Sequence, residues 1–230
     1  MNRFLGAAGA VTLVAASLLS TSCTGAAPVA TRAEPRLVYI DDLEIDEVYE
    51  ALAVEVHVED ADGLDDIESL HVAHDESALY WSFEGGEWGQ LRREGVERFV
   101  IGTLAVPDGT RMPRGRYRVI AVDRAGHSDE TTFTLGETTA VPAREAFPRL
   151  EMQEEQGERV LRVDGSFERV LVQGYTGDGA AVGEITLSPG ETRHAERVSW
   201  LQGPARDLRL YVQATDPDTG AQLRRGPYLP

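Results

Sequence analysis

The densest group of potential ligands in the chain is an acidic cluster around a glycine. Its members are Asp60, Asp62, Asp65, Asp66 and Glu68, with Gly63 among them. Carboxylate oxygens around a tight turn are the ligands that Ca²⁺ prefers, so a calcium site is one interpretation. The spacing departs from the EF-hand order. Asp and Gly are also the usual turn residues between strands, and a solvated turn is the favoured interpretation.

Histidines and tryptophans offer weaker candidates. His71 and His74 are three residues apart and would point to opposite faces of one strand, so they cannot hold one ion together. His57 and His71 could face each other as a zinc site, although exposed strand faces often carry such mixtures. Trp88 stands in the glycine-rich segment GGEWGQ and is the candidate for sugar binding on an exposed ring. Core packing is the alternative for Trp88, as it is for Trp81 and Trp200.

Motifs of covalent or phosphate chemistry are missing from the sequence. There is no G-x-S-x-G elbow, and GYTGDG at 174–179 lacks the spacing and the following helix of a phosphate loop. The one cysteine, Cys23, stands in the N-terminal segment, where its position suggests another role. We therefore expect a protein that is not an enzyme and needs no cofactor other than, in the calcium interpretation, Ca²⁺.

The N-terminal segment has the layout of a secretory signal. Arg3 is followed by an uncharged stretch from Phe4 to Leu19, which is shorter than the roughly 20 residues that span a bilayer. Small residues then lead to Cys23. The segment LLSTSC resembles the lipobox of bacterial lipoproteins, with Ser20 in the usual place of leucine and Leu19 one place earlier, as in spirochaete lipoproteins.

The lipobox resemblance implies a lipid anchor on Cys23 and places the chain on the cell envelope, at the outer membrane or the periplasmic face. Acyl chains contribute about 0.8 kcal/mol per buried methylene, and two lipid signals are enough for stable anchoring. Residues 24–35, TGAAPVATRAEP, are small and without periodicity, which predicts a flexible tether. The predicted order is thus a signal peptide at 1–22 and a lipidated cysteine with its tether at 23–35.

The charge balance limits the partners. The net charge is −17, and removal of Arg3 with the signal makes it −18. Such a chain without a basic run is repelled by phosphate backbones, so nucleic acid is excluded as a partner. We expect contact with the membrane through the lipid alone, and a protein or a surface polymer as the other partner.

Short runs of alternating residues predict an all-β fold. In LAVEVHVED the residues Leu52, Val54, Val56 and Val58 point one way while the polar residues point the other. Further runs are expected at 36–40, 68–73, 78–84, 98–106, 115–123 and 130–135, and a short helical stretch at 43–50 is left open. Seven strands in about 100 residues, separated by turn residues, indicate an antiparallel sandwich over 36–137.

Two segments carry a resemblance to a fold family. VEDADGLDDIESLHV at 58–72 and PRGRYRVIAVDRAG at 113–126 resemble the strand edges and the penultimate hairpin of bacterial immunoglobulin-like or fibronectin-type domains. The resemblance implies the fold alone, because such folds host many functions.

The second half repeats the design after a linker. Residues 138–147 have no alternation, and strands are expected again at 148–153, 159–164, 168–176, 182–188, 196–201 and 207–216. Four residues of one strand, Arg116, Val119, Ala121 and Asp123, recur 93 positions later as Arg209, Val212, Ala214 and Asp216. We predict two tandem immunoglobulin-like sandwiches, at 36–137 and 148–230. The function expected is a membrane-anchored envelope lipoprotein that binds or spaces, or alternatively a calcium-stabilised or carbohydrate-binding module.

Overall fold

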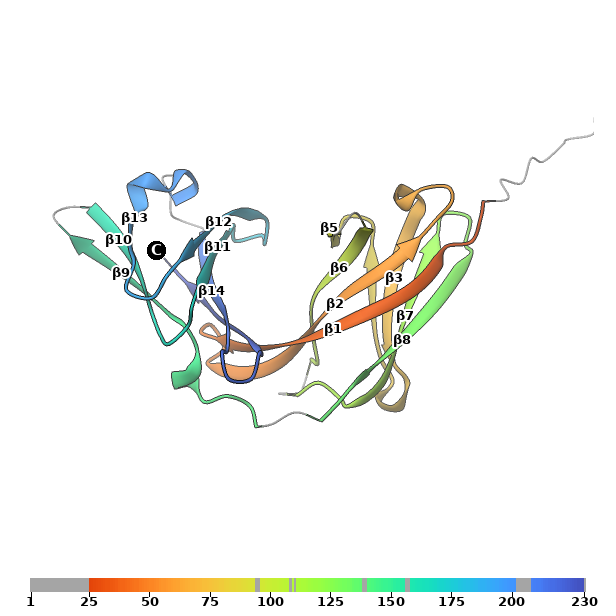
Figure 1. Ribbon diagram of the computed structural model, residues 1–230, viewed down its shortest axis with the longest axis horizontal. Helices are drawn as coiled ribbons and strands as arrows, with labels where there is room; N and C mark the ends of the chain where they lie inside the picture. The colour runs from red at the N-terminus through yellow and green to blue at the C-terminus, as the bar shows by residue number, and fades with distance from the viewer. Residues whose placement is uncertain are drawn as a thin grey trace, which may run out of the picture.

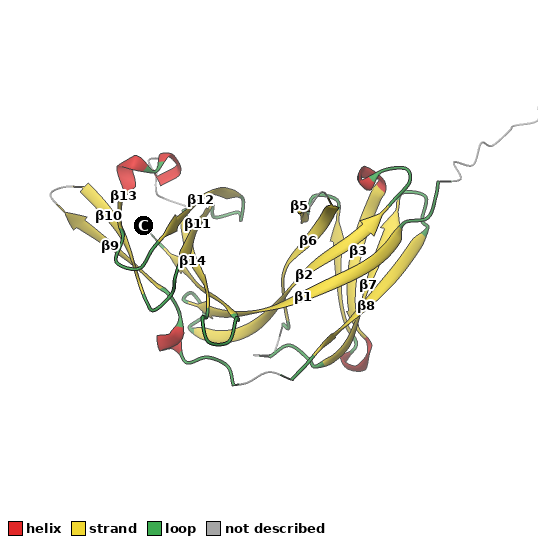
Figure 2. Ribbon diagram, in the orientation of Figure 1, coloured by secondary structure: helices red, strands yellow, loops and turns green. Residues whose placement is uncertain are grey.

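The computed structural model describes residues 25–93, 96–107, 109, 111–137, 140–155, 158–201 and 208–229. In these ranges the chain is all-β, as predicted, and its helices are single 3-10 turns (Figure 2). Among the described residues, no helix has the length and apolar character that crossing a membrane requires. Cys23 and the predicted signal segment lie outside the described ranges.

Eight strands form one curled sheet in the order β12-β11-β14-β15-β1-β2-β6-β5. In that order their bounds are Ala181–Leu187, Val170–Tyr175, Arg209–Thr215, Gln222–Tyr228, Val29–Asp42, Glu47–Glu59, Val96–Ala105 and Trp88–Arg93. The sheet bends into a U, so that β12 and β5 face each other across its opening (Figure 1). We call the sheet face that lines the U the inner face.

Two smaller sheets pack on the outer face and make the two arms of the U. The N-terminal arm has β4 (Leu79–Glu84), β3 (Ile67–His74), β7 (Gly115–Asp123) and β8 (Ser128–Leu135), and the C-terminal arm has β13 (Thr192–His194), β10 (Glu158–Asp164) and β9 (Arg149–Glu155). The 3-10 turns are η1 (Leu64–Asp66), η2 (Asp75–Ser77), η3 (Arg144–Ala146), η4 (Ala195–Arg197) and η5 (Ser199–Leu201). Each arm has its own apolar core.

The long strands β1 and β2 join the two arms. Their antiparallel pairing runs from Val29 opposite Glu59 to Asp42 opposite Glu47. The second half of β1 also pairs in parallel with β15. Leu37, near the middle of β1, contacts both cores. The arms therefore share a continuous hydrogen-bonded sheet, which the sequence did not predict.

Two buried ion pairs hold the shared strands to their surroundings. Glu50 on β2 is fully buried, and its carboxylate accepts hydrogen bonds from Arg114 at 2.8 and 2.9 Å. Asp41 on β1 is also fully buried, 3.2 Å from the Arg225 guanidinium and 3.3 Å from that of Arg144. Burial holds the pKa of Asp41 above its usual value, and the charges of Arg225 and Arg144 offset only part of this rise.

Four segments differ from the sequence prediction. β1 begins at Val29, so residues 29–35 pair with β2 where a flexible tether was predicted. The stretch 43–50, left open as a helix, forms a turn and the start of β2, because the Asp42 carboxylate accepts hydrogen bonds from the backbone of Glu44 and Ile45. The strand predicted at 196–201 is wrong, since η4 and η5 occupy that stretch. The predicted linker at 138–147 contains η3 and ends at Phe147, which is 1% exposed in the core of the C-terminal arm.

Candidate functional site

The inner face carries a group of aromatic and amide side chains around one arginine. The side chains of this group, which we call the tyrosine–arginine cluster, are Tyr49, Tyr175, Tyr211, Gln173, Gln213 and Arg224, from β2, β11, β14 and β15. Strand register brings them together. Gln213 lies opposite Arg224, Arg224 lies opposite Ile40, and Ile40 lies opposite Tyr49. Neighbouring strands are about 4.8 Å apart, so Tyr49 and Arg224 are about 10 Å apart across the sheet.

The guanidinium of Arg224 is held by stacking. Its Cζ atom lies 4.3 Å from the ring centroid of Tyr211 and 5.6 Å from that of Tyr175. The two tyrosine rings meet edge to face at 5.6 Å, which is a favourable arrangement for aromatic quadrupoles. Arg224 has no hydrogen bond or ion pair with any described residue, and its Nε is buried without a partner. The cluster thus holds a stacked positive charge with which no described carboxylate forms an ion pair.

Arg225, the residue after Arg224, has a different environment. Strand alternation directs Arg225 to the outer face, where it contacts the buried carboxylate of Asp41 and donates a hydrogen bond to the carbonyl of Arg144 at 3.3 Å. One arginine of the pair is therefore structural, while its neighbour faces the interior of the U.

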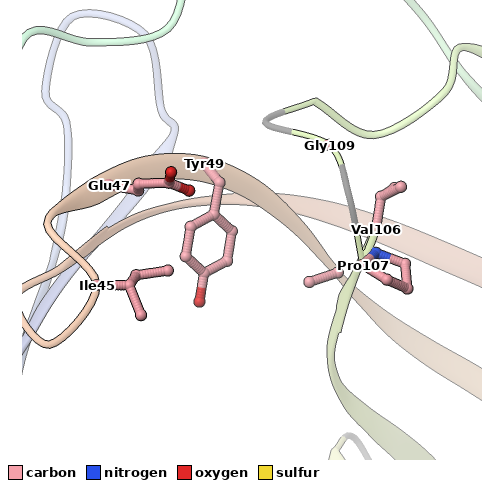
Figure 3. A pocket seen from close by; sticks show the side chains of 7 residues that line it. Ile45, Glu47, Tyr49, Val106, Pro107 and Gly109 are labelled. Atoms are coloured by element: carbon pink, nitrogen blue, oxygen red, sulfur yellow. The ribbon is translucent and has the colours of Figure 1, made fainter.

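A pocket adjoins the cluster at Tyr49. It measures about 520 Å³ and lies between the β1–β2 turn and the chain after β6, lined by Ile45, Glu47, Tyr49, Ala105, Val106, Pro107 and Gly109. Figure 3 shows the Tyr49 ring standing between Ile45 on one side and Pro107 on the other. Burial and the neighbouring Asp42 hold the pKa of Tyr49 above its usual value, and the positive charge of Arg224 offsets part of this rise. The pocket volume is in the range of small-ligand sites.

On the N-terminal half of the inner face, several charged side chains form ion pairs. On the N-terminal arm Glu55 binds Arg36 at 3.3 Å and Arg98 at 3.4 Å. Glu34 lies 3.6 Å from Arg98 and 3.8 Å from His57. Arg36 and Arg98 thus pair with acids on the same face, whereas Arg224 has no ion pair with a described residue.

The predicted acidic loop is brought together in part. Asp60, Asp62 and Asp66 place carboxylate oxygens within 4.8 Å of one another, whereas Asp65 is not a member of this group. Asp62 accepts a hydrogen bond from the backbone of Ala26 at 2.7 Å, and Asp60 accepts one from the backbone of Asp62 at 2.8 Å. The Oδ2 atom of Asp60 is buried without a hydrogen-bond partner. The loop has the geometry of a turn in which three carboxylates converge.

The structure does not bring His57 and His71 together. His57 lies on the inner face beside Glu34, whereas His71 belongs to β3 and stacks on Tyr80 at 5.3 Å. Burial holds the pKa of His71 below its usual value, although the negative charge of Glu84 offsets part of this effect. His74 is 2% exposed and bonds the Ser77 hydroxyl through Nδ1 at 2.7 Å and the Arg114 carbonyl through Nε2 at 3.1 Å. Among the described residues, the group around Asp60 is the one cluster with metal-ligand geometry.

Trp88 is half-buried at the start of β5. Its ring packs edge to face on Phe99 at 5.7 Å and contacts the core of the N-terminal arm. This arrangement favours the core-packing alternative over a sugar-binding ring. Sequence reasoning missed the tyrosine–arginine cluster, although the alternation of Arg209–Thr215 puts Tyr211 and Gln213 on one face.

Comparison with known proteins gives no family. No protein-family model and no curated protein matches the chain. A chain of dimeric latent PorU from Porphyromonas gingivalis is remotely similar in structure, with a TM-score of 0.33 and 11% identity. The alignment covers 94% of this chain and 21% of that chain.

Proposed function

We propose that this protein is a lipid-anchored, non-enzymatic recognition module of the bacterial cell envelope that binds a carboxylate-bearing protein or surface polymer on its inner face. The observation that carries the binding site is Arg224, a stacked cation that forms no hydrogen bond or ion pair with a described residue. Stacking on Tyr211 fixes the guanidinium before a ligand arrives, which lowers the entropy lost on binding. Each arm packs a small sheet on half of the curled sheet, and we infer an immunoglobulin-like sandwich in each.

Localisation follows from Cys23 and the lipobox resemblance. Acylation of the only cysteine would leave no free thiol in the chain, and the lipid would supply the membrane contact. A Cys23→Ala variant is expected in the aqueous fraction of cells that retain the wild-type chain in membranes. If the variant remains in the membrane fraction with unchanged detergent extraction, the anchor is refuted.

A capture experiment tests the inner face. The lipidated chain is used as bait on native membranes, beside Arg224→Gln and the control Arg116→Gln. Both variants lose one positive charge, but Arg116 is exposed on β7 of a small sheet, outside the inner face. A hydrogen bond to a charged group contributes about 1.5–3 kcal/mol, so Arg224→Gln should weaken binding by roughly tenfold to a hundredfold. Equal losses in both variants would show that Arg224 is not the recognition residue.

A calcium-stabilised module is the second candidate, favoured by the convergence of Asp60, Asp62 and Asp66. Ca²⁺ at a hundred times its dissociation constant would stabilise the fold by about 2.7 kcal/mol. Thermal unfolding with and without Ca²⁺ should then show a rise in melting temperature that Asp62→Asn abolishes and Asp65→Asn preserves. No rise at millimolar Ca²⁺ would exclude this function.

A further inference from the structure

The first described residues are fixed to one end of the N-terminal arm. The backbone N–H of Ala26 donates to Asp62 at 2.7 Å, and that of Ala30 donates to Asp129 at 2.9 Å. Strand pairing begins at Val29, opposite Glu59. We call this end the arm tip, and it consists of residues 25–26, the loop 60–66 and the turn 124–127.

The three segments of the arm tip contact one another. The backbone N–H of Arg124 donates to the carbonyl of Asp66 at 3.0 Å, which joins the turn to the loop. A Cβ atom on Gly25 would lie 3.2 Å from the Asp62 carboxylate and 3.9 Å from the Cβ of Ala125. Gly25, the first described residue, therefore lies between the loop and the turn.

Only a short length of chain separates this point from Cys23. Cys23 and Gly25 are two residues apart and therefore at most about 7 Å apart, because an extended chain advances no more than about 3.6 Å per residue. The headgroup layer of one leaflet occupies about 5–7 Å of that reach. A tether of 12 flexible residues, as the sequence predicts, would instead allow about 19 Å on average.

From this reach we propose that the arm tip rests on the lipid surface, so that the U stands on the membrane by the end of its N-terminal arm. This inference depends on the proposed acylation of Cys23. The tip carries Asp60, Asp62, Asp65 and Asp66 against the single cation Arg124, so its charge fits a zwitterionic lipid surface and is repelled by an anionic one.

Two matched positions test the orientation. Asp65 in η1 and Glu76 in η2 are both exposed acidic residues in 3-10 turns, and they stand at opposite ends of β3. The eight residues of β3 separate them by about 26 Å. Asp65→Cys and Glu76→Cys are each labelled with a fluorophore in the lipidated full chain, in phosphatidylcholine vesicles that contain a headgroup spin-label quencher.

Quenching at position 65 should exceed that at position 76 at least threefold. Insertion of ten Gly and Ser residues between Thr24 and Gly25 should remove most of the difference, and 30% phosphatidylglycerol should reduce quenching at position 65. Equal quenching at both positions, or no effect of the insertion, would overturn the orientation while the anchor stands. Retention of Cys23→Ala in vesicles would instead refute the anchor.

Discussion

The ion pair between Glu50 and Arg114 is expected to be among the most costly polar contacts to break on one side. The Glu50 side chain is 0% exposed and that of Arg114 is 16% exposed. Three hydrogen bonds satisfy the carboxylate, two from Arg114 and one from the backbone of Met112 at 3.0 Å. The hydrogen bond with Glu50 raises the pKa of Arg114, although burial lowers it. The Arg114 guanidinium therefore keeps its charge beside the buried carboxylate.

Arg114→Met should remove the counter-charge and leave a buried carboxylate. Breaking a buried pair in this way costs about 3–5 kcal/mol. For a chain of this size the melting temperature should fall by about 6–20 °C. The control is Arg118→Met, because Arg118 pairs with Asp75 and Glu130 at the surface with 33% of its own side chain exposed. Surface pairs contribute at most about 1 kcal/mol.

Urea unfolding in the Cys23→Ala background measures both variants without a lipid. Substitution of both partners, Glu50→Leu with Arg114→Met, should regain most of the loss, because no uncompensated charge remains. The reasoning fails if Arg114→Met costs no more than Arg118→Met. It fails equally if the double variant is less stable than Arg114→Met alone.

Three further predictions concern packing and pH. Gly183→Ala should cost about 1–3 kcal/mol in urea unfolding, because a Cβ there would overlap the indole of Trp200, whereas Gly102→Ala meets no atom within 4 Å and should be nearly neutral. Phe147→Ala should cost about 3–5 kcal/mol although it ends the predicted linker, since it is a core residue, and a loss below 1 kcal/mol would contradict this placement. Burial raises the pKa of Asp123, but hydrogen bonds from His127 outweigh burial and hold this pKa below its usual value. The stabilisation is therefore present above the unfolded pKa of about 3.9 and is lost as the pH falls through the folded value, so Asp123→Asn should flatten the acid limb of stability against pH.

The local strand pattern was predictable because one face of most strands is buried. Leu52, Val54 and Val56 are fully buried, and the intervening Glu55 and His57 face the inner side, as period two requires. The stretch ERVSWL at 196–201 misled the prediction, because a short apolar run does not distinguish a strand from a turn. There the Trp200 ring covers Gly174 and Gly183, a tertiary contact that no local pattern encodes.

The shared sheet was not predictable from local signals. The parallel pair between β1 and β15 places Val38 opposite Gln222, which is far from it in the sequence. The residue pattern of neither strand indicates this partner. The recurrence of Asp123 as Asp216 does have a local cause. Each carboxylate accepts a backbone hydrogen bond inside the turn that follows its strand, from His127 and from Asp218 respectively. The echo therefore reports a common hairpin design, although β7 and β14 belong to different sheets.

The candidate site shows why strand alternation alone cannot assign a function. Arg224 and Arg225 are adjacent and identical in type, so the sequence predicts only that they point to opposite faces. The register with β1 determines which arginine points to the outer face. Asp41 lies opposite Arg225, and Ile40 lies opposite Arg224. The buried carboxylate of Asp41 pairs with Arg225, and the same register places Arg224 on the inner face, where it stacks on Tyr211 and pairs with no described acid. A one-residue slip of β15 would exchange the two roles, so the register that stabilises the joint between the arms also determines which arginine is available to a ligand.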